Sequence, residues 1–250
     1  MTKKTIIITG GNRGIGLSIT QAFLKDGNNV YVGSRKIADL ESLKNDNLIF
    51  IPTDVRKEED VCKLVQRAKS DTGRLDVFIN NAGYSEWRPI EKIDEHFLND
   101  IISTNLNGAF WGCKAAIANM NSDGGSIINI SSIAGKRGSS NNSAYVATKF
   151  GMNGLTQALA KEVGPKGIRV NGICPVLVPT EGLLDALKSK YSPAKGDGRS
   201  FIKKFAFDQS ALKRLPTSED VAAMCLFLAS DASAAITAQN INIDCGVFPQ

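Results

Sequence analysis

The segment TIIITGGNRGIG, from Thr5 to Gly16, joins a short apolar run to a glycine-rich turn and then to a helical pattern. Its first five residues are mostly β-branched, which favours a buried strand. After the glycines, Ile15, Ile19 and Phe23 recur at helical spacing over residues 14–25. The segment therefore predicts a strand, a tight turn and a helix, the opening elements of a βαβ unit.

The same alternation of short apolar runs and longer helical patterns continues along the chain. Strands are predicted at residues 5–9, 29–33, 48–52, 75–80, 126–130, 168–174 and 240–244. Helices are predicted at residues 14–25, 38–44, 57–69, 95–120, 143–164 and 218–229. The strands are apolar on both faces, which indicates a parallel sheet covered by helices on both sides. Because crossovers between parallel strands are right-handed, the sequence predicts an α/β fold with a doubly wound, Rossmann-type sheet.

Length and composition indicate a single domain over residues 1–250. The chain is 42% hydrophobic and contains no Pro/Gly/Ser-rich linker and no internal repeat. Residues 176–215 are too many for a plain connection, so we expect two helices there that form a substrate lid. The net charge of +5 is spread along the chain without a basic cluster. A charge of this size fits a small anionic ligand as well as nucleic acid, but without a basic cluster or an aromatic platform we expect no nucleic acid as partner.

Histidine and cysteine usage excludes several chemistries. His96 is the only histidine and lies in a polar helical stretch, so neither a Ser-His-Asp triad nor a metal site is expected. The five cysteines form no CxxC pair, which favours reduced thiols in a reducing compartment. The apolar run at the N-terminus is too short for a signal peptide, and no run is long enough to span a membrane. We therefore expect a cytoplasmic protein.

The glycine turn after the first strand has the features of a phosphate-binding site. Gly10, Gly14 and Gly16 permit a tight turn and let the backbone approach a ligand closely. The N–H groups and the dipole at the start of the following helix favour an anion such as a pyrophosphate. A close contact between helix and strand, without any ligand, would also require glycines here.

The end of the second strand indicates which dinucleotide binds. An NAD site usually has an acidic residue about twenty positions after the glycine turn, but this chain has Ser34 and Arg35 there. Arg13 lies within the turn itself. Two guanidinium groups suit a 2′-phosphate, so we expect NADP(H) as the cofactor. The alternative is that both arginines are simply solvated.

Tyr145 and Lys149 are four residues apart in a helical pattern and therefore share one helix face. A nearby ammonium group favours the phenolate, so we expect Lys149 to lower the pKa of Tyr145. The phenol would then be a usable general acid or base near neutral pH. On its own, such a pair is common on helix surfaces. Ser132, at the end of the strand 126–130, adds a hydroxyl that can stabilise a developing oxyanion.

These motifs occur in an order that resembles the short-chain dehydrogenase/reductase family along nearly the whole chain. The motifs are TGxxxGxG from Thr9, Asp54-Val55, NNAG at residues 80–83, Thr104-Asn105, Ser132, and YxxxK at Tyr145 and Lys149. The resemblance implies that Ser132 polarises a carbonyl, while Tyr145 supplies or removes the proton. It implies that Lys149 lowers the tyrosine pKa and binds the nicotinamide ribose, and that Asn105 holds a water in a proton relay.

The resemblance also implies a cofactor-binding set. Its members are Gly10, Asn12, Arg13, Gly14, Ile15, Gly16, Ser34, Arg35, Asp54, Val55, Asn81, Ala82, Gly83, Tyr145, Lys149, Pro175, Val178 and Thr180. Within it, Asp54 would hold the adenine amino group and Thr180 the nicotinamide amide. Three positions depart from the family pattern, because Val176, Ala238 and Cys245 replace residues that are usually glycine. These departures put the usual subunit assembly in question more than the chemistry.

The resulting functional hypothesis is an NADP-dependent oxidoreductase that interconverts a secondary alcohol and a ketone. The first substrate guess is a small polyol, sugar or hydroxy acid, and the alternative is a 3-oxoacyl-thioester (acyl-carrier-protein) reductase. An alternative of another class is a non-catalytic protein that senses NADP. The resemblance implies a homodimer or homotetramer and a small carbonyl or alcohol as partner. Five lid lysines allow an anionic substrate or a merely solvated lid: Lys188, Lys190, Lys195, Lys203 and Lys204.

Overall fold

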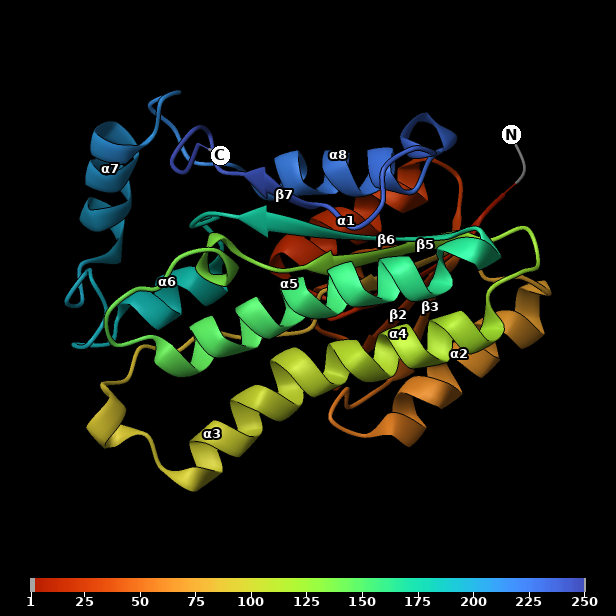
Figure 1. Cartoon of the computed structure of the whole chain (residues 1–250), viewed down its shortest axis with the longest axis horizontal. Coiled ribbons are helices and arrows are strands. Elements are labelled where there is room, and N and C mark those ends of the chain that lie inside the picture. Colours follow the sequence, from red (N-terminus) through yellow and green to blue (C-terminus); the bar gives the residue numbers. More distant parts are fainter. Residues whose placement is uncertain (1–2, 250) are drawn as a thin grey trace.

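The computed structural model describes residues 3–249, and these form a sheet of seven parallel strands (Figure 1). The strands are β1 (Thr5–Thr9), β2 (Asn29–Ser34), β3 (Leu48–Pro52), β4 (Val77–Asn80), β5 (Gly125–Ile130), β6 (Ile168–Pro175) and β7 (Asn240–Ile243). Their order across the sheet is β3-β2-β1-β4-β5-β6-β7. The chain thus winds outward from β1 in one direction and then from β4 in the other. The prediction of a doubly wound sheet is confirmed.

Helices cover both faces of the sheet, as the apolar strands require. One face carries α1 (Gly14–Lys25) and α8 (Ser218–Leu228) (Figure 1). The other face carries α2 (Glu58–Thr72), α4 (Gly108–Asn119) and α5 (Ser143–Val163). This three-layer arrangement buries the sheet on both sides and leaves the strand ends free for a ligand.

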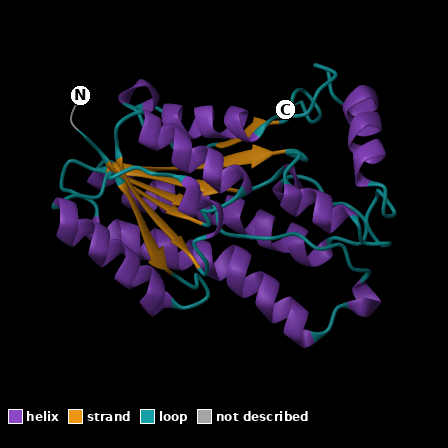
Figure 2. Ribbon diagram, turned by 180° about the vertical axis from the view of Figure 1, so that it is seen from behind, coloured by secondary structure: helices purple, strands orange, loops and turns teal. Residues whose placement is uncertain are grey.

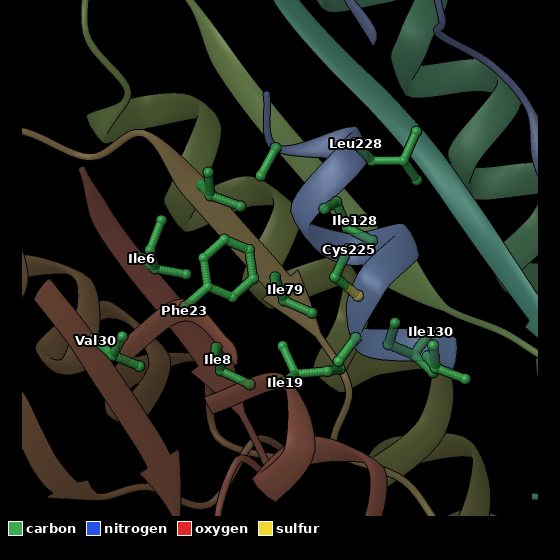
Figure 3. Close-up of a cluster of buried hydrophobic side chains, with 14 of the residues drawn as sticks. Ile6, Ile8, Ile19, Phe23, Val30, Ile79, Ile128, Ile130, Cys225 and Leu228 are labelled. Atoms are coloured by element: carbon green, nitrogen blue, oxygen red, sulfur yellow. The ribbon is translucent and has the colours of Figure 1, made fainter. Parts of the chain in front are cut away.

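The period of two along each strand divides the apolar side chains between two cores. Ile6 and Ile8 of β1 pack with Phe23 of α1 and Leu228 of α8 in the core shown in Figure 3. Ile7, between them, packs into the core on the opposite face. These side chains are buried almost completely, so each core excludes water and fixes the register of the strands.

Two predicted helices differ from the structure. Residues 38–44 were predicted as a helix, but Ala38–Ser42 form one short 3-10 segment. The single helix predicted at residues 95–120 is divided into α3 (Glu95–Ile102), a π-helical segment at Ser103–Asn107, and α4. A π segment contains one extra residue per turn, which sequence periodicity does not reveal. Here it contains Asn105, one of the predicted catalytic residues.

The stretch of residues 176–215 contains α6 (Glu181–Leu187) and α7 (Gly198–Gln209), in agreement with the two helices expected there. Both lie beyond the ends of the strands, and α7 stands at the margin of the molecule (Figure 1). Leu187, at the end of α6, is completely buried. Within residues 3–249, no helix combines the length and the apolar character needed to cross a bilayer.

Two departures from the family pattern occupy an unusual backbone conformation. Ala238 has φ 63° and Cys245 has φ 55°, both in the left-handed region that glycine adopts without strain. The backbone at these two positions therefore has the left-handed conformation that glycine favours, although both residues carry a side chain. All five cysteines are free thiols, and Cys113, Cys174 and Cys225 are buried.

Candidate active site

The carboxyl ends of the strands open into one cleft of about 2410 Å³, between the sheet and the segment with α6 and α7. Figure 2 shows the strand arrows fanning toward that side of the molecule. All but one of the predicted site residues line this cleft: Gly10, Asn12, Arg13, Gly14, Ile15, Gly16, Ser34, Arg35, Asp54, Val55, Asn81, Ala82, Gly83, Ser132, Tyr145, Lys149, Pro175, Val178 and Thr180. Asn105 lies behind the cleft wall. Parallel strand ends meet at one edge, which explains why distant motifs converge.

The glycine turn between β1 and α1 is closed by direct backbone contacts. Gly10 and Gly14 have φ values of +64° and +51°, and a Cβ at Gly16 would lie 2.1 Å from the Gly10 carbonyl oxygen. Asn81 Nδ2 donates hydrogen bonds to the Thr9 and Gly10 carbonyls at 3.1 and 2.9 Å. The turn is therefore rigid, and it presents the start of α1 to the cleft.

Two cations at the nucleotide end of the cleft form no ion pair with any described residue. Arg13 and Arg35 are exposed and line the cleft, and within residues 3–249 neither forms a hydrogen bond through its side chain or an ion pair. The backbone beside Arg35 is fixed, because Ser34 Oγ and Asn12 Nδ2 donate to the Lys36 carbonyl at 2.6 and 3.0 Å. Both guanidinium groups are thus available to an anion.

Asp54, at the end of β3, is held by an arginine. Arg56 contacts both of its carboxylate oxygens and also reaches Asp100 of α3, with closest distances of 2.6 Å to each acid. Hydrogen bonding from Arg56 is the main cause that lowers the pKa of Asp54, so the carboxylate is ionised at neutral pH. The charged acid faces the part of the cleft where an adenine amino group was predicted.

Ser132, Tyr145 and Lys149 meet at the ends of β5 and α5. Lys149 Nζ lies 5.6 Å from the centre of the Tyr145 ring and donates a 2.8 Å hydrogen bond to the Ile130 carbonyl. Ser132 Oγ accepts a 3.1 Å hydrogen bond from the Ala134 N–H, which fixes its position after β5. The three groups predicted from separate motifs are therefore brought together.

The pKa prediction for Tyr145 is wrong for the protein alone. Burial is the main effect, and it raises the pKa of the phenol, while the Ser132 side chain acts in the lowering direction. Burial also lowers the pKa of Lys149 to about 8. The expected effect of Lys149 on the phenol is not found, because its ammonium lies above the ring and bonds to the Ile130 carbonyl. A neutral phenol is a proton donor, so this form of the site is arranged for general acid catalysis.

Asn105 is completely buried and its side chain is fully engaged. Its Oδ1 accepts from the Tyr84 N–H at 3.0 Å, and its Nδ2 donates to the Tyr84 carbonyl at 2.8 Å. A Cβ at Gly83 would lie 3.1 Å from Asn105 Oδ1 and 3.9 Å from Lys149 Nζ. Asn105 is thus near the lysine, and its amide anchors the backbone loop that lines the cleft.

Val176 and Thr180, two of the residues that the sequence singles out after β6, lie beside the cleft. Val176 is 5% exposed and packs with Ile133, Leu215 and Val247 in a small apolar cluster beside the cleft. Thr180 caps α6 by accepting a 3.3 Å hydrogen bond from the Leu183 N–H. A Cβ at Gly14 would lie 3.4 Å from Thr180 Cγ2, so this threonine faces the glycine turn across the cleft.

Sequence reasoning missed several residues that line the cleft, among them three from two neighbouring loops. Ser85 and Trp87 belong to the loop that follows NNAG, and Asn142 directly precedes α5. The available signal was positional, since a loop after β4 must lie at the same sheet edge as the glycine turn. Neither the type nor the spacing of these residues distinguishes them from ordinary loop residues.

Comparison with known proteins is consistent with this geometry. The family model described as "Enoyl-(Acyl carrier protein) reductase" matches residues 10–248. The chain is 36% identical to the 3-oxoacyl-[acyl-carrier-protein] reductase FabG of Chlamydia muridarum, over 99% of this chain and 98% of the relative. It is 35% identical to a putative ketoacyl reductase of monensin polyketide synthase from Streptomyces virginiae, over 98% of this chain and 97% of the relative.

Solved structures share the whole fold. The structure of ElxO with NADP bound is 32% identical with a TM-score of 0.88, and the match covers 100% of both chains. The aldohexose dehydrogenase of Thermoplasma acidophilum is 28% identical with a TM-score of 0.89, over 99% of this chain and 98% of that one. Together with the sheet order and the Ser132–Tyr145–Lys149 group, these matches show that the chain belongs to the short-chain dehydrogenase/reductase family.

Proposed function

We propose that this protein is an NADPH-dependent reductase of 3-oxoacyl thioesters carried by an acyl-carrier protein. The observation that carries the proposal is the 36% identity, over nearly the full length of both chains, to a relative with that printed name. The relatives favour this alternative over the small polyol, sugar or hydroxy acid that the sequence first suggested. The monensin ketoacyl reductase acts, by its name, on the same kind of group.

The nucleotide end of the cleft fits NADP(H) by its own chemistry. The tight turn at Gly16 has no room for a Cβ, so its backbone can lie close to a pyrophosphate. The guanidinium groups of Arg13 and Arg35 line the cleft and match a ribose phosphate. A volume of about 2410 Å³ exceeds what one small ligand occupies, which leaves room for a dinucleotide and a substrate. When bound, the cofactor supplies hydride.

The residues of the reacting centre then have defined roles. Tyr145 donates its proton to the oxygen of the carbonyl that accepts hydride, and Ser132 donates a hydrogen bond to that oxygen. Lys149, held by the Ile130 carbonyl, lies over the Tyr145 ring and orients the centre. Asn105 fixes the loop at Tyr84 that forms the neighbouring wall. The raised pKa of Tyr145 suits the reducing direction, because the phenol keeps its proton until transfer.

Residues 176–215 form the proposed lid over the acyl chain. Phe201 and Phe205 of α7 line the cleft with Val176 and Leu177, and these side chains form one apolar wall. An acyl chain needs an apolar surface of this kind, whereas a sugar needs hydrogen-bonding groups along its length.

We also propose an assembly and a location for the protein. Phe110 of α4 and Phe150 of α5 are 48% and 47% exposed, and exposed aromatic groups on two adjacent helices favour a homodimer or homotetramer. Five free cysteines are consistent with the cytoplasm as the reducing compartment. Size-exclusion chromatography with light scattering tests the assembly, and a monomer would contradict it.

The substrate assay follows NADPH oxidation at its absorbance maximum with matched concentrations of three substrate classes. We expect kcat/KM for acetoacetyl thioesters to exceed the values for keto-sugars and for an enoyl thioester by about 100-fold or more. Higher activity with keto-sugars would reject the proposal. Binding of NADPH without turnover of any class would support the non-catalytic, NADP-sensing alternative.

A further inference from the structure

Asn142 is an N-terminal capping residue that does not use its side chain to cap. Asparagine is a preferred residue at this position because its side-chain oxygen accepts a hydrogen bond from the first turn. Here the Asn142 side chain makes no such bond to α5. The residue is 4% exposed and lines the cleft, and its buried Oδ1 has no hydrogen-bond partner among the described residues. Because buried polar groups are normally hydrogen-bonded, we expect a ligand in this cleft to donate a hydrogen bond to the unpaired oxygen.

Ser85 presents a second unpaired group in the same part of the cleft. Its Oγ is buried and has no hydrogen-bond partner within residues 3–249, and the residue lines the cleft. The loop that contains Ser85 is fastened to the loop that contains Asn142, because the Arg88 N–H donates a 2.7 Å hydrogen bond to the Asn141 carbonyl. The two unpaired groups therefore belong to one connected wall.

This wall lies next to the reacting centre and beneath the proposed lid. Asn142 precedes Tyr145 by three residues, which brings the two close to one face at the start of α5. Asn141 Nδ2 donates to the Tyr191 carbonyl at 3.1 Å, and Ser189 Oγ donates to the Trp87 carbonyl at 3.4 Å. Both loops are thus fixed by the segment that covers the cleft.

We propose that Asn142 and Ser85 bind a secondary amide in the thiol arm of the substrate. An amide offers one N–H and one carbonyl, which match the Asn142 Oδ1 acceptor and the Ser85 hydroxyl donor. The amide would be held on the side of the cleft that leads out past the lid, while the acyl chain contacts the apolar wall of α7. This inference rests on the proposed function, since it assigns the part of a 3-oxoacyl thioester that the catalytic residues do not contact.

The test uses unreactive ligands, so it does not depend on turnover. S-Butanoyl-N-acetylcysteamine carries the amide, and S-(2-acetoxyethyl) butanethioate replaces only its N–H by oxygen. Calorimetric titration of the NADP-loaded protein should show the amide ligand binding about tenfold more tightly than the ester. Asn142→Leu, which keeps the side-chain volume, should reduce this ratio to within twofold. Ser140→Ala, an exposed neighbour outside the cleft, is the matched control and should keep the ratio.

The second variant separates the two roles. Ser85→Ala should weaken both ligands about fivefold and preserve their ratio, because both ligands retain the carbonyl that Ser85 binds. The proposal is overturned by equal affinities in the unmodified protein, or by an unchanged ratio in Asn142→Leu. It is also overturned if S-(2-hydroxyethyl) butanethioate binds as tightly as the amide. An amide preference without turnover of acetoacetyl thioesters would reject the proposed function and leave this binding site in place.

Discussion

The two ends of the cleft differ in whether their positively charged side chains are paired with acidic residues. At the nucleotide end, Arg13 and Arg35 are exposed and, within residues 3–249, free of side-chain hydrogen bonds and ion pairs. At the lid end, Lys188 is paired with Asp185 and Lys204 with Asp208, each at 2.7 Å. Lys190 lies over the ring of Tyr191 at 5.1 Å. The lid is therefore basic in composition, while much of its charge is already neutralised by neighbours.

This difference decides between two interpretations that the sequence left open. Guanidinium groups beside a rigid glycine turn indicate an anion-binding site when they form no ion pair, as is the case for Arg13 and Arg35 within residues 3–249. Within that range, only longer-range attraction to Asp185 and Asp54, respectively, acts on them. Lysines that are paired with an acid within one helix turn indicate a solvated lid. Such exposed ion pairs contribute little to stability, and a lysine already paired in this way attracts an anionic substrate only weakly. The anionic part of a ligand is therefore expected at the glycine turn, and the lid is expected to contact uncharged groups.

The largest expected effect concerns the centre where the two ends meet. Tyr145→Phe removes the proton donor and should reduce kcat by about 10³-fold, within the range typical of lost general acid catalysis. NADPH affinity should change by less than about threefold, since the phenol hydroxyl is one contact among many. Steady-state assays and fluorescence titration of NADPH measure the two quantities. Near-normal turnover would exclude Tyr145 as the proton donor.

Lys149 provides the next largest effect, through the pH dependence of stability. Burial lowers the pKa of Lys149 from the ordinary value of 10.5 to about 8 in the folded protein. Below pH 8 the lysine is charged in both the folded and the unfolded state, so folding carries the full cost of burying the charge. This cost disappears as the pH rises from 8 to 10.5, because the lysine is then neutral when folded. Lys149→Met should therefore raise the free energy of unfolding by about 2 kcal/mol at pH 7 while abolishing turnover. The gain should shrink between pH 8 and 10.5 in urea titrations. Lys161→Met, at an exposed position of the same helix, is the control and should change stability by less than about 0.5 kcal/mol.

A paired substitution compares the two ends of the cleft directly. The unmodified protein should bind NADPH at least about tenfold more tightly than NADH, and Arg35→Ala should remove most of that preference without altering NADH affinity. Lys204→Ala, which removes a paired cation of the lid, should leave the preference unchanged because the Lys204 charge is already satisfied by Asp208. Equal loss in both variants would contradict the distinction between free and paired cations.

The smallest effect lies just before β7, away from the cleft, where the Ala238 N–H donates a 2.9 Å hydrogen bond to the Val170 carbonyl of β6. Ala238 has φ 63°, so Ala238→Gly should relieve backbone strain and raise the free energy of unfolding by about 0.5 kcal/mol. Ala234→Gly provides the contrast, because Ala234 has a helical φ of −56° and should be destabilised by a similar amount. Chemical denaturation of both variants measures the difference. A loss of stability in Ala238→Gly would show that packing of the methyl group outweighs the strain.

Much of the fold followed from sequence because its signals are local. The three central residues of TIIIT at residues 5–9 are consecutive isoleucines, so a strand buried on both faces could be anticipated. The structure places Ile7 in the core on the opposite face from Ile6 and Ile8. The π segment around Asn105 could not be anticipated, because one inserted residue leaves the apolar pattern of residues 95–120 nearly intact. The convergence of Ser132 with Tyr145 followed from strand ends meeting at one edge.

The sequence by itself determined the order of strands and helices, the glycine turn, the absence of an acid beside Ser34, and the shared helix face of Tyr145 and Lys149. Each of these depends on covalent spacing along a few residues. Only the tertiary structure decided that burial raises the pKa of Tyr145, and that Lys188 forms an ion pair while Arg13 forms none within residues 3–249. It also decided that the Asn142 side chain makes no capping hydrogen bond to α5. Desolvation and pairing depend on groups from distant parts of the chain, and no local pattern encodes those distances.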